Sequence, residues 1–97
     1  MNPPRATVVP WYREEDYLEI RKIMSDGSRF PNGFQKWLDR SNRAVDRLLR
    51  EGHIIERVYI DPDTFSDWCG RNGLELDSHA RQKFAVTVAA DKYKSRS

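Results

Sequence analysis

The sequence predicts a helix-rich α+β domain in the approximate order β-α-α-β-α-α, with a small two-stranded sheet. A long amphipathic pattern of helical period occupies residues 32–52. The period then changes over residues 54–60 to the alternation of β-branched and aromatic side chains that is typical of a strand. The chain has 97 residues, the usual length of one domain. We therefore expect a single domain over residues 1–97, with loose tails at 1–5 and 94–97.

The first expected elements are a short strand and a helix. Residues 6–9 favour a strand, which Pro10 either restricts to a sheet edge or ends. A helix follows over residues 14–24, because three acidic residues stand at its start and two basic residues near its end, the order that the helix dipole favours. Gly27 then marks a turn-rich connection to the next helix.

The central helix has one apolar face, and its apolar residues recur in steps of four and three from Phe34 to Leu48. Asn32 is the predicted N-cap, and Gly52 fits the left-handed position that ends many helices. The opposite face carries a line of bases, here called the basic stripe: Lys36, Arg40, Arg43, Arg47 and Arg50.

The basic stripe permits two interpretations. It is a phosphate-binding surface for nucleic acid, or it is a solvated helix face whose bases pair with Asp39, Asp46 and Glu51 at a spacing of four residues. The whole chain has 17 basic and 15 acidic residues, a balance that favours the second interpretation. Nucleic acid is therefore a possible partner but not the favoured one.

The remainder of the chain predicts a strand and two helices. The strand at 54–60 has one good core face, formed by its even-numbered apolar residues. A capping Asp and a Pro at 61–62 start a short helix, which Asn-Gly at 72–73 ends. The last helix runs from residue 78 to about 93 and has a broad face of small apolar residues. The residues expected to form the core are Trp37, Leu38, Val45, Leu48, Val58, Ile60, Phe65 and Trp68.

The sequence contains no common motif for phosphate, dinucleotide, zinc or nucleophile-elbow chemistry. His53, His79 and Cys69 form too small a set for a metal site. Cys69 follows Trp68 on an apolar face, where a thiol is inert. We therefore expect no enzymatic activity, catalytic residue, metal or cofactor.

The location is expected to be cytoplasmic. The single cysteine excludes an internal disulfide and fits a reducing compartment. The N-terminal residues lack the apolar segment of a signal peptide, and no run approaches the ~20 apolar residues of a membrane span.

Seven residues are candidates for contact with a partner or ligand: Trp11, Tyr12, Arg13, Arg40, Arg43, Arg47 and Arg81. Trp11 and Tyr12 are an aromatic pair that either packs over the core or forms a ligand-facing platform, and core packing is favoured. Arg13 and Arg81 can each hold an internal carboxylate or the anion of a ligand, and internal pairing is favoured.

Several short motifs are spread over most of the chain: Trp11-Tyr12-Arg13-Glu14-Glu15-Asp16-Tyr17, Phe30-Pro31, Trp37-Leu38, Val58-Tyr59-Ile60-Asp61-Pro62, Phe65, Trp68-Cys69, Asp77-Ser78 and Ala80-Arg81. Together they resemble a family of small uncharacterised bacterial proteins of similar length. The resemblance implies a bacterial origin and one compact domain. It implies no activity, cofactor or functional residue.

The leading hypothesis is a small non-enzymatic protein-interaction or regulatory module with an unknown protein partner; an antitoxin-like role is one example. The alternatives are a nucleic-acid-binding protein that uses the basic stripe, and a small enzyme that uses Cys69 or the carboxylates at 14–16. A homodimer is expected, because two strands alone are marginally stable and leave open edges. Either a four-stranded sheet or the small-residue face at 80–89 would join the two copies.

Overall fold

The computed structural model describes residues 6–94, and its elements follow the predicted order. The elements are β1 (Ala6–Trp11), η1 (Glu14–Asp16), α1 (Tyr17–Ile23), η2 (Gly27–Arg29), α2 (Phe34–Arg50), β2 (Ile54–Tyr59), α3 (Pro62–Asn72) and α4 (Ser78–Lys94). The prediction of a helix-rich α+β fold with two strands is confirmed. The tails expected at 1–5 and 94–97 lie outside the described residues, except for Lys94 at the end of α4.

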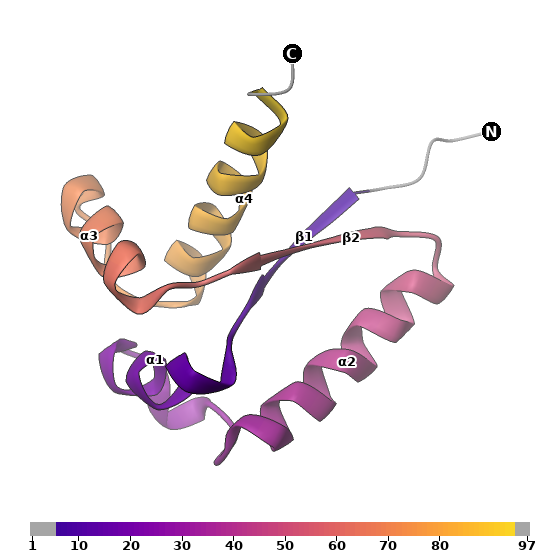
Figure 1. Cartoon of the computed structure of the whole chain (residues 1–97), viewed down its shortest axis with the longest axis horizontal. Coiled ribbons are helices and arrows are strands. Elements are labelled where there is room, and N and C mark those ends of the chain that lie inside the picture. Colours follow the sequence, from indigo (N-terminus) through magenta and orange to yellow (C-terminus); the bar gives the residue numbers. More distant parts are fainter. Residues whose placement is uncertain (1–5, 95–97) are drawn as a thin grey trace.

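The two strands form a parallel sheet that lies between α4 and α2 (Figure 1). Ala6 is opposite Ile54, and Trp11 is opposite Tyr59. Parallel strands require a long crossover connection and are stable when helices cover both faces. Here α1 and α2 supply the crossover, while α2 and α4 cover the faces. Pro10 continues β1 rather than ending it, since a two-stranded sheet has only edge strands, where proline is tolerated.

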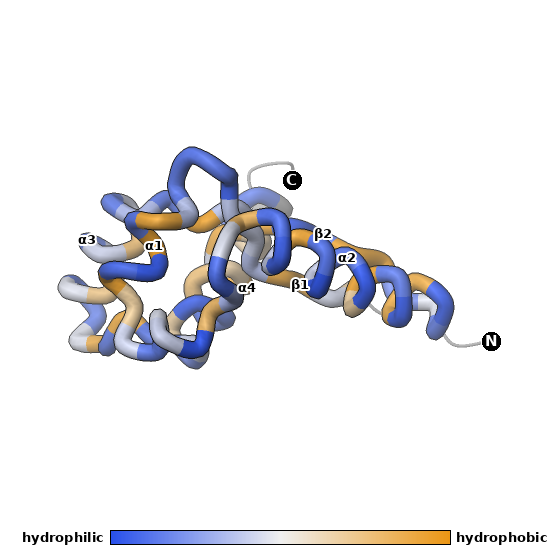
Figure 2. The backbone as a smooth tube through the Cα atoms, turned by 90° about the horizontal axis from the view of Figure 1, so that it is seen from below, coloured by the Kyte–Doolittle hydropathy of each residue, from blue (hydrophilic) through white to orange (hydrophobic). Residues whose placement is uncertain are grey.

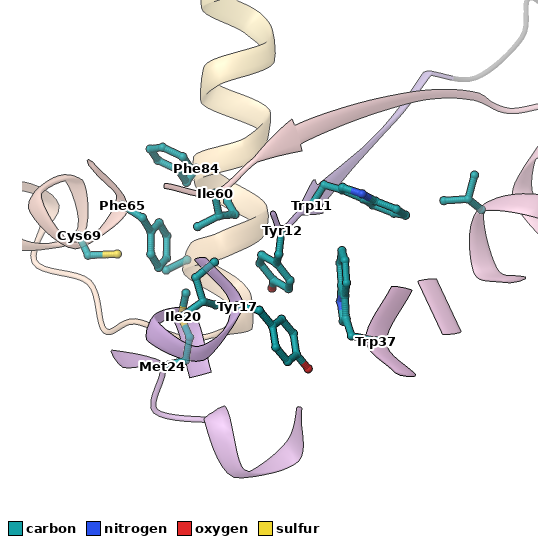
Figure 3. Close-up of a cluster of buried hydrophobic side chains, with 12 residues drawn as sticks. Trp11, Tyr12, Tyr17, Ile20, Met24, Trp37, Ile60, Phe65, Cys69 and Phe84 are labelled. Atoms are coloured by element: carbon teal, nitrogen blue, oxygen red, sulfur yellow. The ribbon is translucent and has the colours of Figure 1, made fainter. Parts of the chain in front are cut away.

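The core has a large part and a small part on opposite faces of the sheet. The large part packs α1, α2 and α3 around an aromatic centre (Figure 3), and its buried members are Trp11, Tyr12, Tyr17, Ile20, Met24, Trp37, Val45, Ile60, Phe65, Cys69, Ala80 and Phe84. The small part joins α4 to the sheet through Val58, Ala85 and Ala89. The small-residue face of α4 is thus occupied within the chain and is not available to a second copy.

Some predicted core positions are less buried than expected. Leu38, Leu48 and Trp68 are half-buried, and Ile54 is 54% exposed although Val58 and Ile60 on the same strand are buried. Figure 2 shows the cause, because α2 and the strands extend to one side as an arm with less protein around it. The radius of gyration is 14.3 Å, against about 12.5 Å for a compact domain of this length.

The ends of α2 confirm one predicted cap and correct the other. Gly33, not Asn32, occupies the N-cap position, and no side chain caps this end. At the other end, Gly52 adopts a φ of 90°. The amides of Gly52 and His53 donate to the carbonyls of Leu49 and Leu48, at 3.1 and 3.0 Å. This is the Schellman pattern that a glycine after the last turn allows.

Among residues 6–94, no helix has both the length and the apolar character that crossing a membrane requires.

Candidate functional site

A surface pocket with a volume of about 250 Å³ lies where the α1–α2 connection and the start of α4 meet the first half of α2. We call it the Arg81 pocket. Its lining residues are Tyr12, Asp26, Arg29, Phe30, Pro31, Trp37, Arg40, Ser41 and Arg81. Three guanidinium groups and one carboxylate line it, which leaves an excess of positive charge. Three of the seven sequence candidates, Tyr12, Arg40 and Arg81, therefore meet in one place.

Arg81 is the fixed cation of the pocket. It lies in the first turn of α4, where the Asp77 carboxylate caps the helix by accepting from the Ala80 amide at 2.9 Å. Two guanidinium nitrogens of Arg81 donate to the two carboxylate oxygens of Asp26, each at 2.8 Å. The guanidinium also lies 5.0 Å from the centre of the Phe30 ring. The internal pairing predicted for Arg81 is confirmed, and the residue is only 8% exposed.

The ion pair determines the protonation of both partners. The hydrogen bonds from Arg81 lower the pKa of Asp26 below its ordinary value. Burial acts to lower the pKa of Arg81, but the hydrogen bond to Asp26 and the nearby Tyr12 outweigh it and raise that pKa. At neutral pH the pair is therefore a carboxylate and a guanidinium.

Tyr12 supplies a hydrogen-bond donor at the inner side of the pocket. The residue is 6% exposed, and burial raises the pKa of its hydroxyl to about 12. Its ring packs against Trp37 and Phe30, with centroid distances of 4.8 and 5.7 Å. Within the described part of the chain, the Tyr12 hydroxyl has no hydrogen-bond partner. It is thus a neutral hydroxyl that can donate a hydrogen bond to water or to a ligand in the pocket.

Trp11 and Tyr12 are core residues, and each is 6% exposed. Figure 3 shows Tyr12 beside Tyr17 and Trp37, with Trp11 packed against Trp37. The favoured prediction of core packing is confirmed, and the alternative of an exposed aromatic platform is wrong. Tyr12 nevertheless reaches the pocket, because the ring is buried and the hydroxyl lies at the boundary of the core.

The connection between α1 and α2 is held in place by three contacts. The Tyr17 hydroxyl donates to the Pro31 carbonyl at 2.6 Å, and the Ser25 amide donates to the Leu76 carbonyl at 2.8 Å. Gly27 packs so closely on α1 that a Cβ there would lie 1.9 Å from the Arg21 carbonyl oxygen. These contacts position Asp26 opposite Arg81, and the pocket is therefore formed in advance of any ligand.

The other two cations of the pocket, Arg29 and Arg40, are exposed. Arg29 is the last residue of η2, and Arg40 belongs to the basic stripe on α2. Arg29 and Asp26 were not identified from the sequence. The Asp26–Arg81 pair joins positions 55 residues apart, and a single sequence contains no signal for such a contact.

The basic stripe lies on the exposed face of α2, and all five of its residues are exposed. In the described range, none of the five forms an ion pair within 4.0 Å. The prediction that these bases pair with Asp39, Asp46 and Glu51 is therefore wrong. Asp39 accepts a hydrogen bond from Gln35 at 3.0 Å instead, and Glu51 lies 3.8 Å from His53.

The remaining candidate, Arg13, lies apart from both surfaces. It is exposed, 3.8 Å from the carboxylate of Asp16, and its guanidinium lies 4.5 Å from the centre of the Tyr59 ring. Such a pair contributes little to stability. Arg43 and Arg47 belong to the basic stripe and do not line the Arg81 pocket.

Cys69 is fully buried, and burial raises the pKa of its thiol. Its sulfur lies 3.9 Å from the Glu75 carbonyl oxygen. A buried thiol with a raised pKa is a poor nucleophile. Over residues 6–94, no three His, Cys, Asp or Glu side chains are grouped in a way that would hold a metal ion.

No protein-family model, curated protein or solved structure matches this chain.

Proposed function

We propose that this protein is a small non-enzymatic interaction module that binds the anionic group of a ligand or partner in the Arg81 pocket. The observation that supports this proposal is the convergence of three arginines and the unpartnered Tyr12 hydroxyl on one pocket that holds a single carboxylate. Carboxylates and phosphates share the chemistry that such a site recognises, an oxyanion that accepts several hydrogen bonds.

The donors differ in what they contribute. Asp26 already neutralises Arg81, so the attraction for an anion comes from Arg29 and Arg40. Arginine is suited to this task because its planar fork of donors matches the oxygens of an oxyanion. The Tyr12 hydroxyl has no hydrogen-bond partner in the described part of the chain, so it adds one further donor for a ligand oxygen.

Binding is favoured over catalysis by the protonation of the groups in the pocket. Tyr12, with a pKa of about 12, keeps its proton at neutral pH. Asp26 accepts both hydrogen bonds from Arg81 and has a lowered pKa, so it is a weak base. These groups donate hydrogen bonds or hold Arg81, and neither is arranged to exchange a proton.

The proposal includes a homodimer in the cytoplasm with a regulatory role. The homodimer is supported by the parallel two-stranded sheet, whose edges are open, and by exposed Ile54 and Tyr59 on β2. A second copy that pairs with β2 would cover an edge of the sheet.

The experiment is a titration with inorganic phosphate and, separately, with acetate, followed by intrinsic tryptophan fluorescence, to which Trp37 in the pocket contributes, and by amide NMR shifts. The Tyr12→Phe variant removes only the hydroxyl, and its matched control is Tyr59→Phe, which removes an exposed hydroxyl outside the pocket. We expect Tyr12→Phe to weaken binding by about tenfold, the effect of one hydrogen bond to a charged acceptor, and Tyr59→Phe to have no effect. Equal affinities for the two variants, or no saturable binding of either anion, would refute the proposal.

A further inference from the structure

Arg40 belongs to both positive surfaces of the molecule. It lines the Arg81 pocket, and it is the second residue of the basic stripe. The pocket and the stripe are therefore continuous along α2, with the pocket near the N-terminal half of the helix. A partner that places one anionic group in the pocket encounters a line of further cations beside it.

The basic stripe is long, regular and accessible. From Lys36 to Arg50 it extends about 21 Å, at the helical rise of 1.5 Å per residue. The helix lies on the outside of the arm that projects from the body of the protein (Figure 2). No ion pair within the described residues neutralises its five side chains. The surface is complementary to a partner with regularly spaced negative charges.

The shape of this surface distinguishes among polyanions. The major groove of duplex DNA admits an α-helix, whereas the deep, narrow major groove of an RNA duplex does not. Proteins that bind single strands use a concave channel with aromatic rings on which bases stack. The stripe is the convex face of a helix and contains no aromatic residue. Protein partners require apolar anchors at the centre of an interface, and the five stripe residues provide none.

We propose that α2 binds duplex DNA through the basic stripe, with one DNA phosphate in the Arg81 pocket. This inference rests on the proposed function and names the source of the anion. The flanking carboxylates of Asp39 and Asp46 repel phosphates, so the affinity is modest, in the range of sequence-independent DNA binding. The stripe positions the protein on the DNA backbone, because contacts from Arg and Lys to phosphate carry no sequence information.

The first measurement is the salt dependence of binding to a short labelled DNA duplex, by fluorescence anisotropy. Five phosphate contacts predict a slope of about −4.5 in a plot of log K against log salt concentration. Single-stranded DNA, duplex RNA and poly-glutamate of matched charge serve as competing ligands. Absence of binding at low salt, or equal affinity for poly-glutamate, would overturn the inference.

The second measurement compares two double variants with the same change in net charge. Arg43→Gln with Arg47→Gln removes two stripe residues that do not line the pocket. The control, Arg71→Gln with Lys83→Gln, removes two exposed bases on α3 and α4. We expect the stripe variant to reduce the slope by about 1.8 and the control to leave it unchanged. Equal losses in the two variants would show a net-charge effect and refute a role for the stripe.

Asp46→Asn provides a test in the opposite direction, since removing a flanking carboxylate is expected to tighten DNA binding. A phosphate titration separates this inference from the proposed function, and the Arg43→Gln, Arg47→Gln variant is expected to bind phosphate like the parent protein. If the pocket binds phosphate but the parent protein does not bind DNA, the DNA inference alone is refuted. DNA binding that Tyr12→Phe and Arg29→Gln leave unchanged would refute the placement of a phosphate in the pocket.

Discussion

The ion pair between Asp26 and Arg81 predicts a large effect for a small chemical change, Asp26→Asn. The substitution preserves the size of the side chain but removes the charge that faces Arg81, whose side chain is only 10% exposed. One carboxylate oxygen that accepts from Arg81 at 2.8 Å is replaced by an amide nitrogen, which donates. Arg81 would then carry a buried charge without its partner.

The expected loss in the free energy of unfolding is about 2–3 kcal/mol. Removing one member of a fully buried pair costs about 3–5 kcal/mol. The Asp26 side chain is 24% exposed, so water compensates part of that loss. For a domain of this size, the loss corresponds to a decrease in Tm of roughly 10–20 °C.

Urea unfolding followed by circular dichroism measures this loss, with Asp16→Asn as the matched control. Asp16 forms an exposed pair with Arg13 at 3.8 Å, and its replacement is expected to cost less than about 1 kcal/mol. An Asp26→Asn variant that unfolds at the same urea concentration as Asp16→Asn would refute the structural role of the Arg81 pair.

The pH dependence of the free energy of unfolding is a second test of the Asp26–Arg81 pair. Arg81 lowers the pKa of Asp26 below its ordinary value of 3.8. A lowered carboxyl pKa contributes stability that is present above the ordinary pKa and is lost as the pH falls through the lowered one. The parent protein is therefore expected to have a higher free energy of unfolding than Asp26→Asn, with the whole difference present at pH 6. Below about pH 4 this difference is expected to decrease. A difference that stays constant down to pH 2 would contradict this account.

Three further predictions concern stability and assembly. Gly27→Ala is expected to destabilise the protein by more than 1 kcal/mol in urea, because the new Cβ would lie 1.9 Å from the Arg21 carbonyl oxygen; a melting curve like that of the parent would contradict it. Trp68→Ala, at the margin of the large core, is expected to cost about 2–5 kcal/mol by the same measurement, and more than Leu48→Ala in the less covered arm; the reverse order would show that the core is wrongly located. Light scattering over a concentration series is expected to give twice the mass of one chain, and the mass of one chain at every concentration would exclude the homodimer.

Local patterns in the sequence determined the elements of this fold. The apolar residues of α2 recur with the helical period, and Gly52 ends that helix in the way its lack of a Cβ permits. The burial of Trp11 and Tyr12 also followed from the sequence, because aromatic side chains beside a strand supply much of a small core. Each of these features depends on residues that are neighbours in the chain.

The site was decided by the tertiary structure. Asp26 and Arg81 are 55 positions apart, and Arg29 and Arg40 join them only because the α1–α2 connection packs against α2 and α4. The exposure of the basic stripe without ion pairs is likewise a property of the folded surface, since spacing along a helix allows a pair but does not require one. Contacts between distant segments depend on how the elements pack, and that packing reflects the whole chain rather than any local pattern.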